Sequence, residues 1–93
     1  MLKFNANNVD ELEAEARERA HEVSVNVVTC VIKALEADVD KVIIGIMITV
    51  DLDLSVERSG YLEALQTNLV RCEEAEEYEL CKEAIKWIKK LSE

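Results

Sequence analysis

One stretch, Lys41 to Glu57 (KVIIGIMITVDLDLSVE), constrains the fold more than any other part of the chain. From Ile48 onward, apolar and polar residues alternate without a break for ten positions. A period of two in a segment rich in β-branched residues is typical of a β-strand with one buried face. The residues before it, 42–47, are apolar on both faces, and Gly45 among them is a natural place for a bend or bulge. We therefore expect one long strand, bent near Gly45.

The rest of the chain is predicted to be mostly helical. Residues 1–6 alternate weakly and predict a short N-terminal strand. Over residues 9–37, apolar residues recur every three or four positions, which predicts one long helix, although the β-branched segment 21–35 could instead form a strand. Two shorter helical patterns, 60–74 and 77–91, predict a C-terminal αα-hairpin. We expect an α+β fold in which all 93 residues form a single domain.

The charge and cysteine content disfavour several classes of function. Acidic residues outnumber basic ones by 20 to 11, a formal charge of −9, which disfavours direct contact with nucleic acid or an anionic membrane. A basic partner protein is favoured instead, because opposite charge promotes association. The start of the chain lacks a signal-peptide pattern, and the longest apolar run, 42–50, is about half the length of a membrane-spanning helix. Together with an odd number of cysteines, this predicts a cytoplasmic protein with reduced thiols.

The densest cluster of charge lies at the corner of the predicted hairpin. Five carboxylates fall close together there: Glu73, Glu74, Glu76, Glu77 and Glu79. They repel one another unless a cation or a basic partner is near, so we predict that this corner binds a basic protein, such as one that normally holds nucleic acid. The competing structural explanation is a solvated corner whose acids stabilise the start of the second helix through its dipole.

The polar row of the predicted strand contains two more carboxylates, Asp51 and Asp53. Paired carboxylates can bind Mg²⁺ or act in acid–base catalysis, but the sequence marks no further ligand or nucleophile. Two alternatives remain: these carboxylates protect a free strand edge from pairing, or they flank a homodimer seam. We expect the seam, and we include both aspartates among the partner-binding residues. The apolar row predicted to form the dimer interface is Ile48, Val50, Leu52, Leu54 and Val56.

The cysteines and the single histidine predict no catalytic or metal site. Cys72 and Cys81 are nearly equidistant from the hairpin corner, so they are either small buried core residues or an oxidisable pair. Cys30 and His21 lie nine positions apart, about 13 Å along one helix, which is too far for a catalytic dyad. Metal-binding Cys-x-x-Cys and His-x-x-x-His pairs and glycine-rich phosphate-binding motifs are absent from the sequence. The sequence therefore predicts no metal, no cofactor and no enzymatic activity.

The C-terminal hairpin, residues 65–91, resembles the UVR motif of the nucleotide-excision-repair B and C subunits, a helical hairpin with an aromatic–Glu pair at its corner. The matching positions are Tyr78 and Glu79 for that pair, Cys81 for the small residue after it, and Ile88 and Leu91 for apolar positions of the second helix. The departures are Lys82, where the family has a second small residue, and Ile85 and Lys86, where it has Arg-Asp. That family uses the hairpin for protein–protein contact, so the resemblance implies an interaction module.

Three classes of function follow from these patterns. The first is a non-enzymatic binder; in size, acidity and lack of catalytic residues the chain is similar to small phage anti-defence proteins such as the anti-CRISPR proteins. The second is a homo-oligomeric structural or assembly protein, in which the predicted strand pairs with a copy of itself. The third is a small metal- or thiol-dependent enzyme. Our central hypothesis is a homodimer that binds a basic partner protein.

Overall fold

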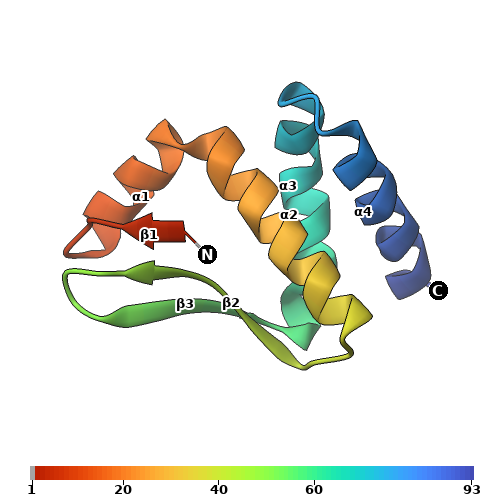
Figure 1. Ribbon diagram of the computed structural model, residues 1–93, viewed down its shortest axis with the longest axis horizontal. Coiled ribbons are helices and arrows are strands. Elements are labelled where there is room, and N and C mark those ends of the chain that lie inside the picture. Colours follow the sequence, from red (N-terminus) through yellow and green to blue (C-terminus); the bar gives the residue numbers. More distant parts are fainter. Residues whose placement is uncertain (1) are drawn as a thin grey trace.

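Within residues 2–93, which the computed structural model describes, three strands and four α-helices follow one another, so the predicted α+β class is confirmed (Figure 1). Met1, the first residue of the predicted N-terminal strand, lies outside the described residues. The elements are β1 (Leu2–Phe4), α1 (Val9–Glu18), α2 (Ala20–Glu36), β2 (Lys41–Met47), β3 (Leu52–Glu57), α3 (Tyr61–Glu74) and α4 (Tyr78–Leu91). A short 3₁₀ helix, Arg58–Gly60, leads from β3 into α3. The predicted N-terminal strand and C-terminal αα-hairpin are both present.

The strands form a sheet in the order β1-β2-β3, with β1 parallel to β2 and β2 antiparallel to β3. A β-bulge between Ile43 and Gly45 lies where the sequence predicted a bend. Gly45 pairs with Leu2 of β1, and a Cβ atom on this glycine would lie 2.9 Å from Cε2 of Phe4 and 3.1 Å from the carbonyl oxygen of Leu2. The missing side chain therefore allows β1 to approach β2 closely.

The prediction of one long strand over residues 41–57 is wrong. Residues 48–51 form a turn, in which the N–H of Val50 donates to the carbonyl oxygen of Met47 (3.3 Å) and Asp51 adopts a left-handed conformation (φ 51°). The two halves of the stretch consequently pair with each other as a β-hairpin. A fully extended strand of this length would span about 56 Å, whereas the longest dimension of the molecule is 38 Å.

The predicted long helix over residues 9–37 is also wrong at its centre, because it consists of two helices that meet at Arg19 (φ −110°, ψ 30°). The Arg19 guanidinium donates to the carbonyl oxygen of Lys3 (2.8 Å) and lies over the Phe4 ring, 5.1 Å from its centroid. Arg19, at the junction of the two helices, therefore links both of them to β1. The break also lets α1 lie beside β1 while α2 packs against α3 (Figure 1). The segment 21–35, for which a strand was the alternative, is helical.

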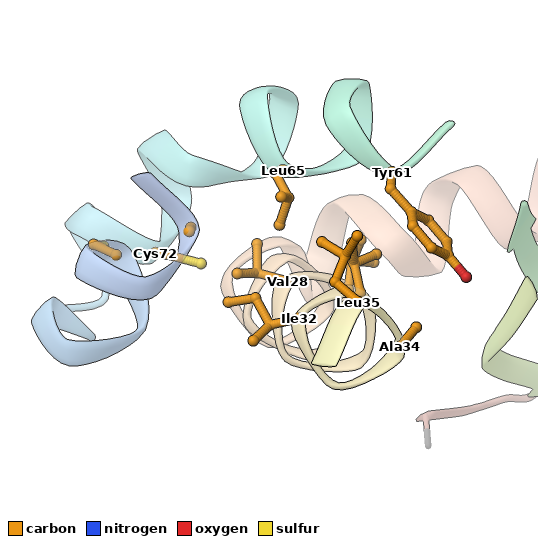
Figure 2. Close-up of a cluster of buried hydrophobic side chains, with 11 residues drawn as sticks. Val28, Ile32, Ala34, Leu35, Tyr61, Leu65 and Cys72 are labelled. Carbon is orange, nitrogen blue, oxygen red and sulfur yellow. The ribbon is translucent and has the colours of Figure 1, made fainter. Parts of the chain in front are cut away.

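The main hydrophobic core lies between α2, α3 and α4. Tyr61, Leu65 and Cys72 project from α3 toward α2, where Val28 is equally buried (Figure 2). The Tyr61 hydroxyl donates to the carbonyl oxygen of Val39 (3.0 Å), which satisfies its polar atom at the edge of this core. Helix α4 closes the core with the small buried residues Cys81 and Ala84. This arrangement fixes the turn between α3 and α4 at the surface.

A second, smaller core lies between β1, the hairpin and α1. Phe4, Ala6 and Met47 are buried there, and Leu12 and Leu54 pack against them. Both cores lie on the same side of the sheet, because Leu54, which packs against the smaller core, and Val56, which packs against the main core, are two residues apart on β3 and project to the same face. The other face of the sheet and the outer edge of β3 are therefore left in solvent.

Candidate functional site

The predicted acidic cluster forms the turn between α3 and α4. After α3, Glu76 adopts a left-handed backbone conformation (φ 60°), which reverses the chain. The N–H of Glu77 then donates to the carbonyl oxygen of Cys72 (3.0 Å), a bond typical of the Schellman helix end. All five predicted carboxylates are exposed and lie in this turn or in the helix ends that flank it. We call this set the acidic corner: Glu73, Glu74, Glu76, Glu77 and Glu79.

Neighbouring cations do not neutralise the acidic corner. Among residues 2–93, none of its five carboxylates forms an ion pair with a lysine or an arginine. Nε2 of His21 lies 3.1 Å from Oε1 of Glu74, but a histidine carries charge only when it is protonated. This contact joins the start of α2 to the end of α3. His21 therefore lies against the acidic corner, a neighbourhood that no sequence pattern indicates.

A surface hollow of about 480 Å³ opens beside the acidic corner, between α2, the start of β1 and the turn after α3. Leu2, Val25 and Ala75 provide its apolar lining. Two carboxylates, Glu22 and Glu77, also line the hollow. Hydrogen bonds from the Arg19 guanidinium lower the pKa of Glu22 and so keep it ionised, and Arg19 compensates its charge in an ion pair. Glu77 therefore provides the uncompensated charge of the hollow. An apolar lining beside a free carboxylate suits a side chain with an aliphatic stem and a cationic head.

The hollow is a feature that sequence reasoning missed. Its residues come from three elements that are distant in the chain, and none belongs to a recognisable motif. The apolar spacing of α2 identifies its buried side but does not indicate that Val25 remains accessible. No sequence signal could have found this hollow.

Asp51 and Asp53 do not lie together on the polar face of one strand as predicted. Asp51 is in the turn of the hairpin, whereas Asp53 is in β3, and both are exposed. Within residues 2–93, no group of three or more His, Cys, Asp or Glu side chains is arranged to hold a metal ion. Asp53 shares its exposed face of β3 with Ser55 and Glu57.

The five residues predicted to form a dimer interface do not make one continuous row. Ile48 and Val50 belong to the turn and are 47% and 46% exposed, and Leu52, at the start of β3, is 53% exposed. Leu54 and Val56 are half-buried against the two cores. Among these five residues, the exposed ones therefore lie at the end of the hairpin, residues 48–52, which we call the hairpin tip. Its role as a dimer interface stays a prediction.

The cysteines occupy different environments. Cys72 and Cys81 are both buried in the main core, as one of the two predicted alternatives required. Burial raises the pKa of the Cys72 thiol to about 11 and also raises that of Cys81, so both are protonated at neutral pH and poor nucleophiles. Cys30 is half-buried, with its thiol 3.8 Å from Oδ1 of Asn26. His21 contacts Glu74 instead of a cysteine, so no Cys–His dyad forms.

Comparison of the chain with protein-family models, with curated proteins and with solved structures finds no match. No helix within residues 2–93 combines the length and the apolar character needed to cross a lipid bilayer. The UVR-like and anti-CRISPR-like resemblances therefore stay predictions.

Proposed function

We propose that this protein is a non-enzymatic, acidic protein-binding module that occupies a basic surface of a partner protein. The observation that carries the proposal is the acidic corner, with five exposed carboxylates and no lysine or arginine paired to them within residues 2–93. A basic surface relieves their mutual repulsion on binding, and the overall charge of −9 accelerates the encounter. Basic protein surfaces commonly hold nucleic acid. By covering one, the module would act as an inhibitor, in the manner of the small phage proteins it resembles in general character.

Stabilisation of a helix end explains only some glutamates of the acidic corner. The others are better explained by a role in binding. Glu79 lies in the first turn of α4, where the positive end of the helix dipole stabilises a carboxylate. Glu73 and Glu74 lie at the end of α3, where the negative end of the dipole disfavours them. Glu76 adopts the left-handed conformation, for which glycine is the usual residue. Glu73, Glu74 and Glu76 are therefore unfavourable for the stability of this helix end, and binding to a basic partner would explain their presence.

The hollow beside the acidic corner provides a specific contact for such a partner. A lysine or arginine side chain can lay its methylene groups against Leu2, Val25 and Ala75 while its charged end reaches Glu77. Binding would then bury apolar surface in addition to pairing charges. A contact of this kind discriminates a defined basic protein from a diffuse positive charge.

Charge reversal of the acidic corner tests the proposal. The test variant replaces Glu73, Glu74, Glu76 and Glu77 with lysine. A control variant makes the same change at four exposed glutamates elsewhere, Glu13, Glu18, Glu36 and Glu63, so that both variants have the same net charge. We expect a pull-down from the native host to capture a basic, nucleic-acid-binding protein with the wild type and the control, and to lose it with the corner variant. Equal capture by the two variants would remove the acidic corner from the binding surface.

A second candidate function is self-association, which the exposed hairpin tip favours. Ile48, Val50 and Leu52 expose roughly half of their surface each, and a two-fold contact would bury them against the same residues of a second copy. Size-exclusion chromatography with light scattering should then give the mass of a dimer at micromolar concentration. The variant Ile48→Thr with Leu52→Thr should shift that mass to a monomer. A monomeric wild type would contradict this second function and leave the first one intact.

A further inference from the structure

Strand β3 is the outer strand of the sheet, and its free backbone groups belong to three residues. The N–H of Arg58 donates to the carbonyl oxygen of Asp40 (2.7 Å), which points the backbone of position 58 toward β2. Along an antiparallel strand the backbone groups point alternately toward and away from the neighbour. Positions 56 and 54 therefore also point inward, and the N–H and C=O groups of Asp53, Ser55 and Glu57 face outward from the sheet.

The same three residues place their side chains on the solvent face of the sheet. Glu57 lies opposite Lys41 and Asp53 opposite Ile46, whereas Val56 and Leu54 face the cores on the other side. Within residues 2–93, neither Asp53 nor Glu57 forms an ion pair with a lysine or an arginine. The open edge therefore combines unpaired backbone groups with a net negative charge, since Lys41 faces Glu57 but no cation faces Asp53 across the strand pair.

A second copy of this chain is a poor occupant of the edge. Antiparallel pairing of two β3 strands about Ser55 places Asp53 opposite Glu57 of the copy, and pairing about Asp53 places that residue opposite itself. Pairing about Leu54 places Asp53 opposite Ser55 and leaves Glu57 beyond the end of the copy's β3, beside its turn residue Asp51. Like charges directly opposite each other destabilise a strand pair. The registers about Ser55 and Asp53 therefore set carboxylates directly opposite each other, and the register about Leu54 gathers the carboxylates of both copies on one face of the joined sheet.

We propose that the edge of β3 binds an extended segment of a partner protein in which lysine or arginine alternates with apolar residues. The basic side chains lie opposite Asp53, Ser55 and Glu57 on the solvent face, and the apolar ones extend the row of Leu54 and Val56. Main-chain hydrogen bonds supply affinity in this mode of recognition, and the alternating side chains supply specificity. The proposal depends on the basic partner of the proposed function, but it uses a surface separate from the acidic corner.

A peptide titration tests the edge directly. The probe is a fluorescein-labelled ten-residue peptide in which lysine alternates with valine or threonine, with binding followed by fluorescence anisotropy at 0.05 M and 0.15 M salt. The variant Ser55→Pro removes one outward N–H, a change that an edge strand tolerates because that group faces solvent. We expect this variant to bind the peptide about tenfold more weakly than the wild type, because it loses one main-chain hydrogen bond and the proline ring obstructs the neighbouring contacts. The double variant Asp53→Lys with Glu57→Lys should abolish binding.

A second probe keeps the protein unchanged and so does not depend on the folding of the variants. The same peptide with N-methyl groups on every other amide retains its charge but cannot form the main-chain bonds of one edge, so it should bind at least as weakly as Ser55→Pro does. Backbone NMR shifts on titration should cover residues 52–57. If the methylated and unmethylated peptides bind equally, or if the shifts appear only at residues 73–79, the edge is not the site. The acidic-corner variant should keep most of its affinity for this peptide, which separates failure of the edge from failure of the proposed function.

Discussion

The replacement of Gly45 by alanine tests the close approach of β1 to β2, the feature on which the hairpin and the smaller core depend. A Cβ atom at this position would meet Cε2 of Phe4 at 2.9 Å and the carbonyl oxygen of Leu2 at 3.1 Å. The Phe4 ring cannot move away cheaply, because it is buried and lies beneath the Arg19 guanidinium. The Leu2 oxygen belongs to the backbone of β1. We therefore expect Gly45→Ala to push β1 away from the sheet.

The expected change in the free energy of unfolding is the sum of two opposing contributions. Alanine reduces the conformational freedom of the unfolded chain relative to glycine, which stabilises the fold by about 0.4–1 kcal/mol where the native geometry permits it. Gly45 has a negative φ, so its backbone permits alanine. Overpacking of a filled site costs about 1–3 kcal/mol. The net change should be a loss of about 1–2 kcal/mol, a large part of the roughly 5–14 kcal/mol expected for a chain of this length.

Gly60→Ala is the matched control. A Cβ atom there would meet only Cγ1 of Val56, at the ordinary contact distance of 3.4 Å, and Gly60 also has a negative φ. This variant should gain about 0.4–1 kcal/mol. Urea denaturation followed by circular dichroism should place the midpoint of Gly45→Ala about 0.5–1 M below that of the wild type and that of Gly60→Ala above it. If Gly45→Ala is as stable as Gly60→Ala, β1 does not pack against Gly45 as described.

Two further predictions concern the main core. Leu65 is fully buried, so Leu65→Ala should lower the free energy of unfolding by about 3 kcal/mol and Tm by roughly 15 °C. Val70 lies on the same helix but is 60% exposed, so Val70→Ala should change the free energy of unfolding by less than about 0.5 kcal/mol. A loss under about 1 kcal/mol in Leu65→Ala would contradict the place of Leu65 in the core. Burial raises the pKa of the Cys72 thiol to about 11, so the folded state favours the protonated form, and the resulting stabilisation should be complete below pH 8 and disappear as the pH rises from about 9 to 11. Cys72 should contribute about 2 kcal/mol to the decline that urea denaturation shows across this range, so the decline should be shallower in Cys72→Ala and unchanged in Cys30→Ala; an unchanged slope in Cys72→Ala would refute the assignment.

The sequence predicted the type of most elements, because periodicity reports which side of a segment is buried. The spacing of apolar residues identified α2, α3 and α4, and the alternation from Leu52 onward identified β3. The turn at 48–51 was missed because Ile48 and Val50 continue the apolar alternation and no glycine, proline or asparagine interrupts it. Asp51 supplies the left-handed conformation that a glycine usually marks. Periodicity carries no information about where a chain reverses when the turn residues continue the alternation of the strands.

The break at Arg19 could not be predicted from local sequence for a similar reason. The residues around it are good helix formers, and none interrupts the spacing of apolar positions. The break depends on a tertiary contact, the bond from the guanidinium to the carbonyl oxygen of Lys3, which is distant in sequence. The acidic corner was found because its residues are adjacent in the chain. The hollow beside it combines distant residues and required the three-dimensional structure.

Protection of a free edge and binding of a basic partner segment are compatible roles for Asp53 and Glu57, the carboxylates of β3. The repulsion that opposes the pairing of two β3 strands arises from the same field that attracts a basic segment, because both depend on the net negative charge of Asp53 and Glu57 on the solvent face of the sheet. An edge that was only protected would be equally well served by lysine, the residue most often found there. In a chain that also exposes five glutamates at the acidic corner, acidic protection selects the same class of partner at a second surface. Two separate acidic sites on a molecule 38 Å long could engage one extended basic surface together, and each would then raise the effective concentration of the other.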